Sequence, residues 1–541
     1  SMTAPAAESR PGTRVGETGD GTGSVFSAGD RFAVQIDGEE GIYIVQDNNT
    51  VKAETPLYWS DTGDHTVTAW YPATGGTLDL GDQSQSLAYL LYGSGTGNYQ
   101  TPVMLTFAHQ LAKVRVTPTA AALGEVTSLQ LYTYTQCTYE KGEAGQGSQE
   151  GWIEMKKCEY TENGNAITCW EANVVPGYTI TKLQANGTEV RELSSDITPV
   201  ASKFYNITLN YDPGYTEVSE GNYTVDNEKG LRNLAKLVNS NGGKTLINIT
   251  LTGDITLTGE WTPIGNYENR YTGTFDGGGH TITGLKINQS GTDNVGLIGC
   301  LGSGGKVQNV TLTNISVSGA NCVGGIAGQN YGTVENCSVN GTVTGKGFTD
   351  TGGIAGSNYG TISGCSAEGT VTGSVNVGGI AGGSYLGSTI EGCHSTAAVS
   401  GISSVGGVVG NLGNNSFLMA CYSTGNVTAT ITDGYAHVGG VVGINGQGTV
   451  TACYHATGEI TSSVGDRIGG IAGCNDQGTF TACYWENNQE QGTGSGSTGG
   501  TTMVTDDDWQ TAVTQMNAAL QSAGSEWRYE LTGVLPTLKK Q

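Results

Sequence analysis

Short runs of alternating apolar and polar residues follow one another through the first two hundred residues. Examples are RFAVQI from Arg31, HTVTAWYPA over 65–73, LTFAHQLAKVRVT over 105–117 and SKFYNITLNY over 202–211. A period of two, bounded by Gly, Asp, Asn or Pro, is typical of strands in antiparallel sheets. About 190 residues of this texture, from 22 to 211, predict two β-sandwiches rather than one, divided near 118–125.

From residue 323 onward a phrase recurs at intervals of 28, 26, 28, 33 and 30 residues. VGGIAGQNYGTVENC starts at Val323 and TGGIAGSNYGTISGC at Thr351, and a cysteine follows the first phrase glycine after 13 to 15 residues. The first glycines are Gly324, Gly352, Gly378, Gly406, Gly439 and Gly469, and the cysteines are Cys337, Cys365, Cys393, Cys421, Cys453 and Cys483. Glycine suits tight corners, and Val, Ile and Thr suit strands, so the array predicts a parallel β-solenoid.

Two segments show the helical period instead. In 226–243 Leu231, Leu234, Ala235 and Val238 share one face, with Asp226 or Asn227 as N-cap and Gly242 or Gly243 at the end. In TDDDWQTAVTQMNAALQSAG a second apolar face carries Trp509, Ala512, Val513, Met516 and Leu520, with Thr505 as N-cap. We interpret Asp506 to Asp508 as acids that complement the helix dipole, with a calcium site as the alternative. We expect both helices to cover open ends of the solenoid.

Composition narrows the classes of partner. Only 13% of the residues are charged, and 24 Lys plus Arg against 49 Asp plus Glu give a formal charge of -25, which disfavours nucleic acid and anionic membranes. No run of 18 apolar residues occurs, and SMTAPAAESRPGTRVG lacks the regions of a signal peptide. Because Ser1-Met2 look like a cloning remnant, we expect that an export or lipoprotein signal has been removed.

Two groups stand out among the twelve cysteines. The six of the repeat form a ladder, and parallel Cβ directions do not suit disulfides, so we expect thiols packed inside the solenoid, with cross-links between some rungs as the alternative. Zinc is disfavoured because no CxxC pair is present. Outside the array, Cys137, Cys158 and Cys169 allow one pair and one free thiol.

The repeats resemble the GLUG family of Gly-rich bacterial surface repeats. The lead-in fits too, with WTPIG from Trp261, YTGTFDGGGHTITGLKI over 271–287 and VGLIG from Val295, so the resemblance covers Trp261 to Trp485. This family occurs in adhesins and as accessory regions of large surface proteases. The resemblance therefore implies a location more than an activity.

The first two hundred residues resemble the fimbrillin-like proteins of Gram-negative gut and oral anaerobes. The matches are VFSAGDRFAV from Val25, the stretch from Trp59 to Pro72, the element Phe107, His109 and Leu111, VVPG from Val174, and SKFYNITLNY. This resemblance implies two transthyretin-like β-sandwiches in a surface fimbrial subunit, exported as a lipoprotein and assembled by exchange of a strand between neighbours.

The predicted fold is all-β, with two transthyretin-like sandwiches followed by a parallel β-solenoid with short capping helices. The predicted division is a flexible arm over 1–21, sandwiches over 22–118 and 119–211, a linker and entry cap over 212–260, the solenoid over 261–485 and a C-terminal cap over 486–541.

No catalytic site is predicted. None of the six histidines is followed by Glu, which excludes HExxH, and G-x-S-x-G is absent. We interpret His109 as structural and FDGGGH over 275–280 as a turn. The repeat carboxylates are scattered rather than stacked, at Glu335, Glu368, Glu391 and Glu459. We therefore predict no enzyme, no cofactor and no metal.

The repeats do present aromatic rows. Tyr331, Tyr359 and Tyr385 stand seven residues after the first phrase glycine, and Asn330 and Asn358 precede two of them. Tyr422, Tyr454 and Tyr484 directly follow ladder cysteines, so they point outward if the cysteines point inward. Aromatic rows with amide neighbours suit sugar rings or protein hot spots, and the alternative is that the tyrosines stack to stabilise the ladder.

These patterns predict a cell-surface adhesin whose solenoid binds host or microbial glycans or proteins. An accessory or degradative surface lipoprotein for glycan uptake is the alternative. After Tyr211 the chain continues through DPGYTEVSEGNYT into about 320 further residues, so a C-terminal strand would be obstructed, whereas the arm carries Arg10 and Arg14 as processing sites. We expect a fimbrial tip subunit that associates with other subunits by strand exchange, at the outer membrane or fimbria of a Gram-negative bacterium.

Overall fold

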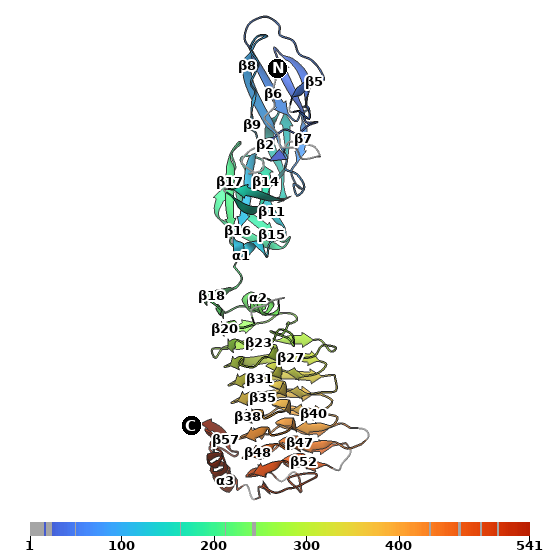
Figure 1. Cartoon of the computed structure of the whole chain (residues 1–541), viewed down its shortest axis with the longest axis vertical. Helices are drawn as coiled ribbons and strands as arrows, with labels where there is room; N and C mark the ends of the chain where they lie inside the picture. Colours follow the sequence, from blue (N-terminus) through green and yellow to red (C-terminus); the bar gives the residue numbers. More distant parts are fainter. Residues whose placement is uncertain are drawn as a thin grey trace. The chain divides into compact units, whose positions relative to one another are not determined.

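The computed structural model describes two compact units, Ser1–Asp212 and Pro213–Gln541. The described residues are 16–17, 24–48, 50–162, 164–210, 212–240, 245–431, 434–463, 467–486, 489–505 and 508–541. Arg10, Arg14 and most of the predicted arm lie outside them. Both units are rich in strands (Figure 1), which confirms the all-β prediction.

The first unit begins with a six-stranded antiparallel sheet in the order β5-β4-β3-β6-β8-β9. Its strands are β3 (Arg31–Ile36), β4 (Glu39–Val45), β5 (Val51–Ala53), β6 (His65–Tyr71), β8 (Leu91–Gly97) and β9 (Thr106–His109), and a short pair precedes them, β1 (Gly16–Glu17) with β2 (Ser24–Val25). Phe26 packs on Phe32 and Phe107, with ring centroids 5.7 and 5.1 Å apart. Apolar residues of the flanking segments, among them Leu87 and Val103, complete this core.

Two further sheets enclose a second core in the same unit. One has the order β13-β14-β10-β17, and the other is β12-β11-β15-β16 with β7 added beside β11. Their bounds are β7 (Gly76–Asp79), β10 (Ala112–Pro118), β11 (Leu129–Glu140), β12 (Glu143–Glu154), β13 (Lys156–Glu162), β14 (Asn165–Val174), β15 (Ile180–Ala185), β16 (Glu189–Ile197) and β17 (Phe204–Leu209); the one-turn helix α1 (Ala120–Leu123) follows β10. Val114 and Trp170 from one sheet and Leu131 from the other are buried in this core.

The boundary expected at residue 118 differs from the observed strand pairing. Residues 112–118 form β10, whose two neighbours β14 and β17 both belong to the second core. Residues 76–79 form β7, which likewise pairs with β11. The alternation in β10 buries Ala112, Val114 and Val116 against the second core, so the chain changes sheets before the predicted division and not after it.

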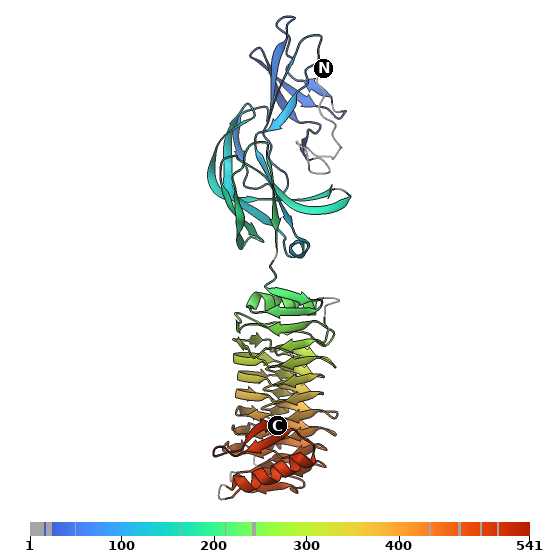
Figure 2. The same ribbon diagram turned by 90° about the vertical axis from the view of Figure 1, so that its left-hand side faces the viewer.

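The second unit is a parallel solenoid of about nine turns, against six clear repeats in the sequence (Figures 1 and 2). Successive strands of a coil join four ladders, called here faces 1 to 4. Face 1 contains β18 (Tyr215–Ser219), β19 (Asn222–Val225), β20 (Asn248–Leu251), β22 (Thr274–Asp276), β26 (Lys306–Gln308), β30 (Thr333–Glu335), β34 (Thr361–Ser363), β38 (Thr389–Glu391), β43 (Phe417–Met419), β48 (Thr449–Thr451) and β53 (Thr479–Thr481). Apart from β18, which is antiparallel to β19, these strands run parallel and in register.

Three other faces complete the coils, and faces 3 and 4 begin only at β25 (Ile298–Leu301) and β28 (Val323–Gly324). Face 2 contains β21 (Ile255–Thr256), β23 (Thr281–Thr283), β24 (Lys286–Asn288), β27 (Thr311–Gly319), β31 (Ser338–Gly345), β35 (Ser366–Thr372), β39 (His394–Ser395), β40 (Ala398–Gly401), β44 (Tyr422–Ser423), β45 (Val427–Ala429), β49 (Tyr454–His455), β50 (Ile460–Ser462), β54 (Cys483–Trp485) and β55 (Thr501–Met503). Face 3 contains β25 (Ile298–Leu301), β29 (Ala327–Asn330), β33 (Ala355–Asn358), β37 (Ala381–Ser384), β42 (Val409–Leu412), β47 (Val442–Gly446) and β52 (Ala472–Asp476). Face 4 contains β28 (Val323–Gly324), β32 (Thr351–Gly352), β36 (Val377–Gly378), β41 (Ser404–Gly406), β46 (His437–Gly439) and β51 (Ile468–Gly469).

The ladders extend beyond the predicted limits of the solenoid. β19 and β20, in the segment expected to be a linker and entry cap, pair in parallel with each other and then with β22. At the other end β55 pairs with β54, so the array continues to Met503. The segment over 212–260 lacks the repeated phrase, and only the pairing of its strands shows that it forms coils.

Both predicted helices are present. α2 (Glu228–Asn239) begins after Asn227, whose side chain accepts a hydrogen bond from the Gly230 amide at 2.9 Å, and its apolar face packs on the first coils. The predicted C-terminal glycines of this helix lie outside the described residues. α3 (Trp509–Ser522) has Asp508 as its N-cap, because that side chain accepts from the Thr511 amide, so the prediction of Thr505 was wrong.

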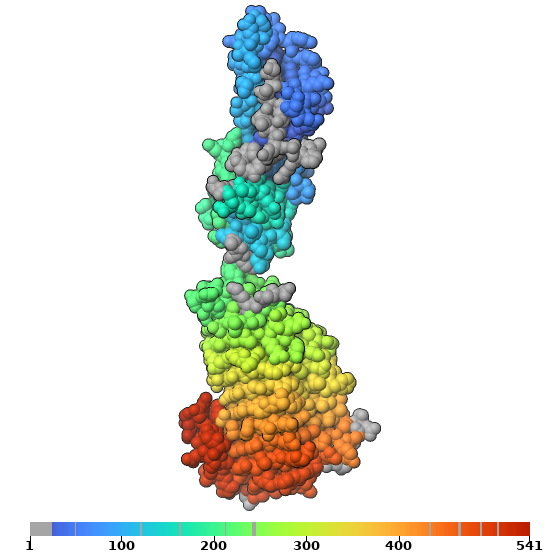
Figure 3. Space-filling view, viewed as in Figure 1, coloured from blue at the N-terminus to red at the C-terminus, as the bar shows by residue number. Residues whose placement is uncertain are grey.

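α3 lies on the side of the last coils and not across an open end (Figures 2 and 3). It is buried against Ala420, Ala452 and Tyr454, together with Tyr529 from the hairpin of β56 (Trp527–Glu530) and β57 (Thr537–Lys540). The buried residues of α3 are those predicted from the helical period. The helix, however, covers a side of the solenoid, whereas the sequence predicted that it would cover the open end.

Candidate functional site

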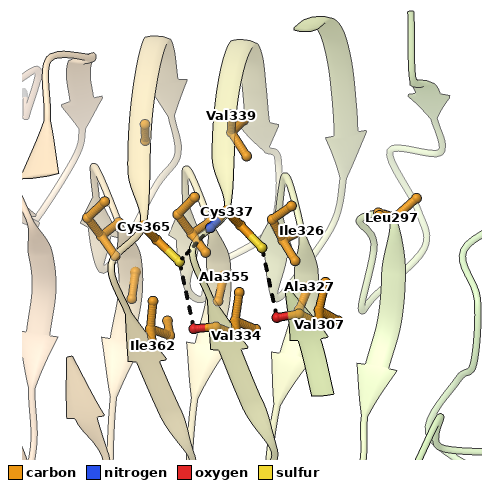
Figure 4. Packing of buried hydrophobic residues seen from close by; sticks show 14 of the residues in the cluster. Leu297, Val307, Ile326, Ala327, Val334, Cys337, Val339, Ala355, Ile362 and Cys365 are labelled. Atoms are coloured by element: carbon orange, nitrogen blue, oxygen red, sulfur yellow. Dashed lines mark hydrogen bonds between the residues drawn. The ribbon is translucent and has the colours of Figure 1, made fainter. Parts of the chain in front are cut away.

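The ladder cysteines lie inside the solenoid, as predicted from their spacing. The Sγ of Cys337 donates to the carbonyl oxygen of Glu335 at 3.2 Å and lies 3.9 Å from that of Val307 (Figure 4). Cys365 repeats the arrangement with Ser363 and Val334. All six ladder thiols are buried, and burial raises the pKa of Cys365 well above its ordinary value.

All twelve cysteines are free thiols in this structure, so no rung is cross-linked. Cys137, Cys158 and Cys169 are buried, and no pair among them is bonded, although Cys158 and Cys169 are cross-strand partners. Among the described residues, no three His, Cys, Asp or Glu side chains are grouped so that they could hold a metal ion.

Asn330 and Asn358 were expected to offer amides to a ligand, and the structure contradicts this. Both are fully buried. The Nδ2 of Asn330 donates to the Oδ1 of Asn358 at 2.8 Å, and the Nδ2 of Asn358 donates to the Oγ of Ser384 at 3.1 Å. Successive side chains of a strand point to opposite sides, so each asparagine points inward and the tyrosine that follows it points outward. The inward amides form a ladder that satisfies hydrogen-bonding groups at the corner between faces 3 and 1.

Tyr331, Tyr359 and Tyr385, which we name the open row, stand outside this corner and are half-buried. The rings of Tyr331 and Tyr359 are stacked, with centroids 4.7 Å apart and planes at 8°. Tyr359 and Tyr385 are 5.6 Å apart and tilted by 37°. Partial burial raises the pKa of Tyr359 to about 12. The rings therefore stack on one another, as the structural interpretation of the row expected, and they keep exposed surface, so ligand binding by the row stays a prediction.

An arginine and a fourth tyrosine extend the open row. The guanidinium of Arg270 lies 4.4 Å from the ring centroid of Tyr331 and 4.9 Å from that of Tyr267. Tyr267 is 62% exposed. Sequence reasoning missed both residues, because they precede the recurring phrase and have no counterpart at a fixed spacing. Guanidinium groups stack favourably on tyrosine faces, so Arg270 closes one end of the row.

Tyr385 ends the row at a buried carboxylate. Its hydroxyl donates to the Oδ1 of Asp350 at 2.9 Å, and the same carboxylate accepts from Asn376 and Ser357. The Tyr385 ring can lie across the strand because Gly383 has no side chain there; a Cβ on Gly383 would come within 2.1 Å of the tyrosine oxygen. Burial raises the pKa of Asp350 despite its three donors. Tyr385 is thus a fixed structural member of the row.

Tyr422, Tyr454 and Tyr484, which we name the covered row, do point outward, but the second and third are buried. Tyr422 stacks on Tyr454 at 4.8 Å and 5°, and the indole of Trp509 in α3 lies 4.9 Å from Tyr454. The hydroxyl of Tyr484 donates to Gln515 of α3. The expectation that Tyr454 and Tyr484 bind a ligand is therefore contradicted, because the C-terminal helix and hairpin cover them, whereas Tyr422 is part-buried and its role in binding stays a prediction.

The other residues considered for catalysis have structural roles. His109 ends β9 at the sheet edge, with its ring 6.0 Å from that of Tyr89. In FDGGGH the Oδ1 of Asp276 accepts from the Gly278 amide at 2.9 Å, and Gly278 and Gly279 have positive φ, which confirms a turn. Glu335 is paired with Lys306. Within the described ranges, no helix combines the length and the hydropathy that a membrane span needs.

Comparison with known proteins divides the chain in the same way. Residues 14–227 match the fimbrillin-like family model, and residues 319–344 and 349–372 match the GLUG motif. The chain is 41% identical over 145 residues to halomucin of Haloquadratum walsbyi, and 44% identical over 82 residues to a Gly-rich membrane protein of Evansella cellulosilytica. These matches cover 24% and 15% of this chain but only 2% and 10% of the relatives.

Solved structures with likeness to the chain include a candidate cell adhesion protein from Bacteroides uniformis, at 20% identity and a TM-score of 0.27 over 36% of this chain and 91% of that one. The fimbrial anchor protein Mfa2 from Porphyromonas gingivalis is 11% identical, with a TM-score of 0.20 over 34% of this chain and 79% of that one.

Proposed function

We propose that this chain is a bacterial surface adhesin whose solenoid presents the open row to a partner on another surface. The fimbrillin-like match over 14–227 supports a surface protein related to fimbrial subunits, and the GLUG motifs agree with that location. The observation that carries the proposal is the open row itself. It is a register-repeated set of aromatic side chains, flanked by an arginine, that keeps exposed surface on the side of the solenoid.

The geometry of the row favours a protein surface as the partner. The faces of Tyr331 are occupied by Arg270 and Tyr359, so the row offers ring edges and hydroxyls and not open faces for sugar stacking. Tyrosine and arginine, with tryptophan, are enriched in the hot spots of protein interfaces. A host or microbial protein therefore fits the row better than a bare glycan, which is the other ligand class that the row pattern suggests.

The test replaces Tyr331 and Tyr359 by Ala and leaves Tyr385 in place, because Tyr385 also bonds the buried Asp350. Binding of the full chain to an array of extracellular-matrix proteins and glycans should fall at least tenfold in this variant, on protein spots. The matched control is Tyr435→Ala, which removes another exposed tyrosine stacked on an arginine, Arg467, at 4.6 Å. Equal binding by the double variant and the unmodified chain would exclude the open row.

We also propose a position at the tip of a fimbria, assembled with other subunits by strand exchange and anchored at the outer membrane. In support, the last strand of the first unit, β17, leads into β18 of the second unit, so β17 has no free end to donate. Antibodies against the solenoid should then label fimbrial ends in electron micrographs. Label spread evenly along the shafts would contradict the tip position without affecting the role of the open row.

A further inference from the structure

A small pocket lies at the loop end of the first sheet. Its volume is about 140 Å³, and it lies between the loop before β6 and the loop that joins β8 to β9. The lining residues are Ile36, Trp59, Asn98, Tyr99, Gln100, Thr101, Pro102 and Val103. Ile36 and Val103 are buried and give the pocket an apolar base, whereas Tyr99 is 57% exposed. The pocket thus combines two aromatic side chains with amide and hydroxyl groups.

The loop after β8 is held in one conformation by its own hydrogen bonds. The Oδ1 of Asn98 accepts from the amides of Gln100 and Thr101, both at 2.9 Å. The Nδ2 of Asn98 donates to the Oδ1 of Asp64 at 2.6 Å, which ties this loop to the one before β6. The Nε2 of Gln100 donates to the Tyr99 hydroxyl at 2.7 Å. The polar groups of the pocket are therefore preorganised, which lowers the entropic cost of binding.

The opposite wall, Trp59, is positioned by a histidine between two carboxylates. His65 contacts the Oδ1 of Asp37 through Nδ1 at 2.8 Å and the Oδ1 of Asp61 through Nε2 at 3.0 Å. The imidazole lies 5.7 Å from the Trp59 ring. The hydrogen bond to Asp37 raises the pKa of His65, which favours the imidazolium that can donate to both aspartates. The indole of Trp59 thus lies beside a hydrogen-bonded imidazole and also lines the pocket.

We propose that this pocket binds one neutral sugar ring at the end of a glycan chain. Aromatic side chains pack against the C–H faces of a sugar, and the Gln100 amide and the Tyr99 and Thr101 hydroxyls suit its hydroxyl groups. None of the eight lining residues is Lys or Arg, and Asp61 and Asp64 lie on the adjoining loop, so an acidic sugar would be repelled. The volume is below the roughly 300–1,000 Å³ of common small-molecule sites, which limits the ligand to one ring.

The test uses the full chain and saturation-transfer difference NMR with the methyl glycosides of glucose, galactose, mannose, fucose and N-acetylglucosamine, and methyl glucuronoside as the acidic probe. At least one neutral glycoside should receive saturation from the protein, and the glucuronoside should not. The double substitution Tyr99→Ala with Gln100→Ala should reduce the signal at least fivefold. Both positions are exposed, so the variant keeps the fold.

Two controls separate this pocket from other aromatic surfaces. Tyr58→Ala removes a tyrosine that is 84% exposed and outside the lining, and it should leave the signal unchanged. The open-row variant, Tyr331→Ala with Tyr359→Ala, should also keep it. The proposal is overturned if no neutral glycoside gives a signal, if the glucuronoside gives an equal one, or if the signal survives in the pocket variant. Loss in the open-row variant alone would assign sugar binding to the solenoid.

Discussion

The open row and the covered row arise from the same geometry and differ in exposure. In both, neighbouring coils stack tyrosines almost parallel, with Tyr331 and Tyr359 at 4.7 Å and Tyr422 and Tyr454 at 4.8 Å. The first pair keeps exposed surface, whereas Tyr454 is fully buried. Register thus determines that a side chain points outward, but a separate segment determines whether it meets solvent.

The covering segment also satisfies the polar groups that it buries. The hydroxyl of Tyr454 donates to the carbonyl oxygen of Pro536, and that of Tyr484 donates to Gln515. A buried hydroxyl without a hydrogen-bond partner reduces stability. These two hydrogen bonds therefore allow the covered row to become part of a core. The open row has no such cover among the described residues, and Arg270 closes one end of it.

Among the changes that test the contrast between the two rows, Trp509→Ala should cause the largest loss of unfolding free energy. Trp509 is 1% exposed and packs on Tyr454, and truncating a buried tryptophan costs about 3–5 kcal/mol of unfolding free energy. Urea unfolding, followed by circular dichroism, measures the loss. Leu386→Ala, which truncates a side chain that is 77% exposed, should change stability by no more than about 0.5 kcal/mol. Equal small losses in both variants would show that α3 does not stabilise the covered row.

Asn358→Ala tests what lies under the open row. It removes the acceptor of the Asn330 amide and of the Gly360 backbone N–H, and an unsatisfied buried group costs about 1–3 kcal/mol. The control is Asn340→Ala, an exposed asparagine on β31 of a neighbouring coil. Thermal unfolding of the two variants should differ by several degrees in midpoint, and indistinguishable midpoints would show that the amide ladder is dispensable.

The smallest of the three expected effects is a shift in the ionisation of one tyrosine, which alkaline titration measures. Partial burial raises the pKa of Tyr359 to about 12, against about 10 for an ordinary tyrosine. Because the pKa of Tyr359 is higher in the folded state than in the unfolded state, the stabilising contribution of the neutral phenol is complete below pH 10. That contribution is lost as the pH rises through about 12. The ultraviolet difference between the unmodified chain and Tyr359→Phe should therefore show one tyrosine ionising near pH 12. Ionisation of that tyrosine near pH 10 would mean that the stacking is absent in solution.

The sequence predicted those features that repeat. Cys337 and Cys365 hold equivalent positions in neighbouring coils, so one period predicted the solenoid, the inward thiols and the outward tyrosines. The first coils were missed because β19 and β20 contain no phrase, only alternating residues such as Tyr223 and Val225. Arg270 and the cover over Tyr454 were missed because contacts between residues far apart in sequence leave no local pattern.

The coils are not of equal length, and most of the largest difference lies at one corner. The interval of 26 residues from Gly352 to Gly378 and that of 33 from Gly406 to Gly439 lead to the same pairing of glycines on face 4. Most of the additional residues fall between β45 and β46, at the corner of faces 2 and 4. Evolution can therefore insert or remove residues there without shifting the inner ladder, and an engineered peptide spliced into that corner would be displayed while the thiols stay in register.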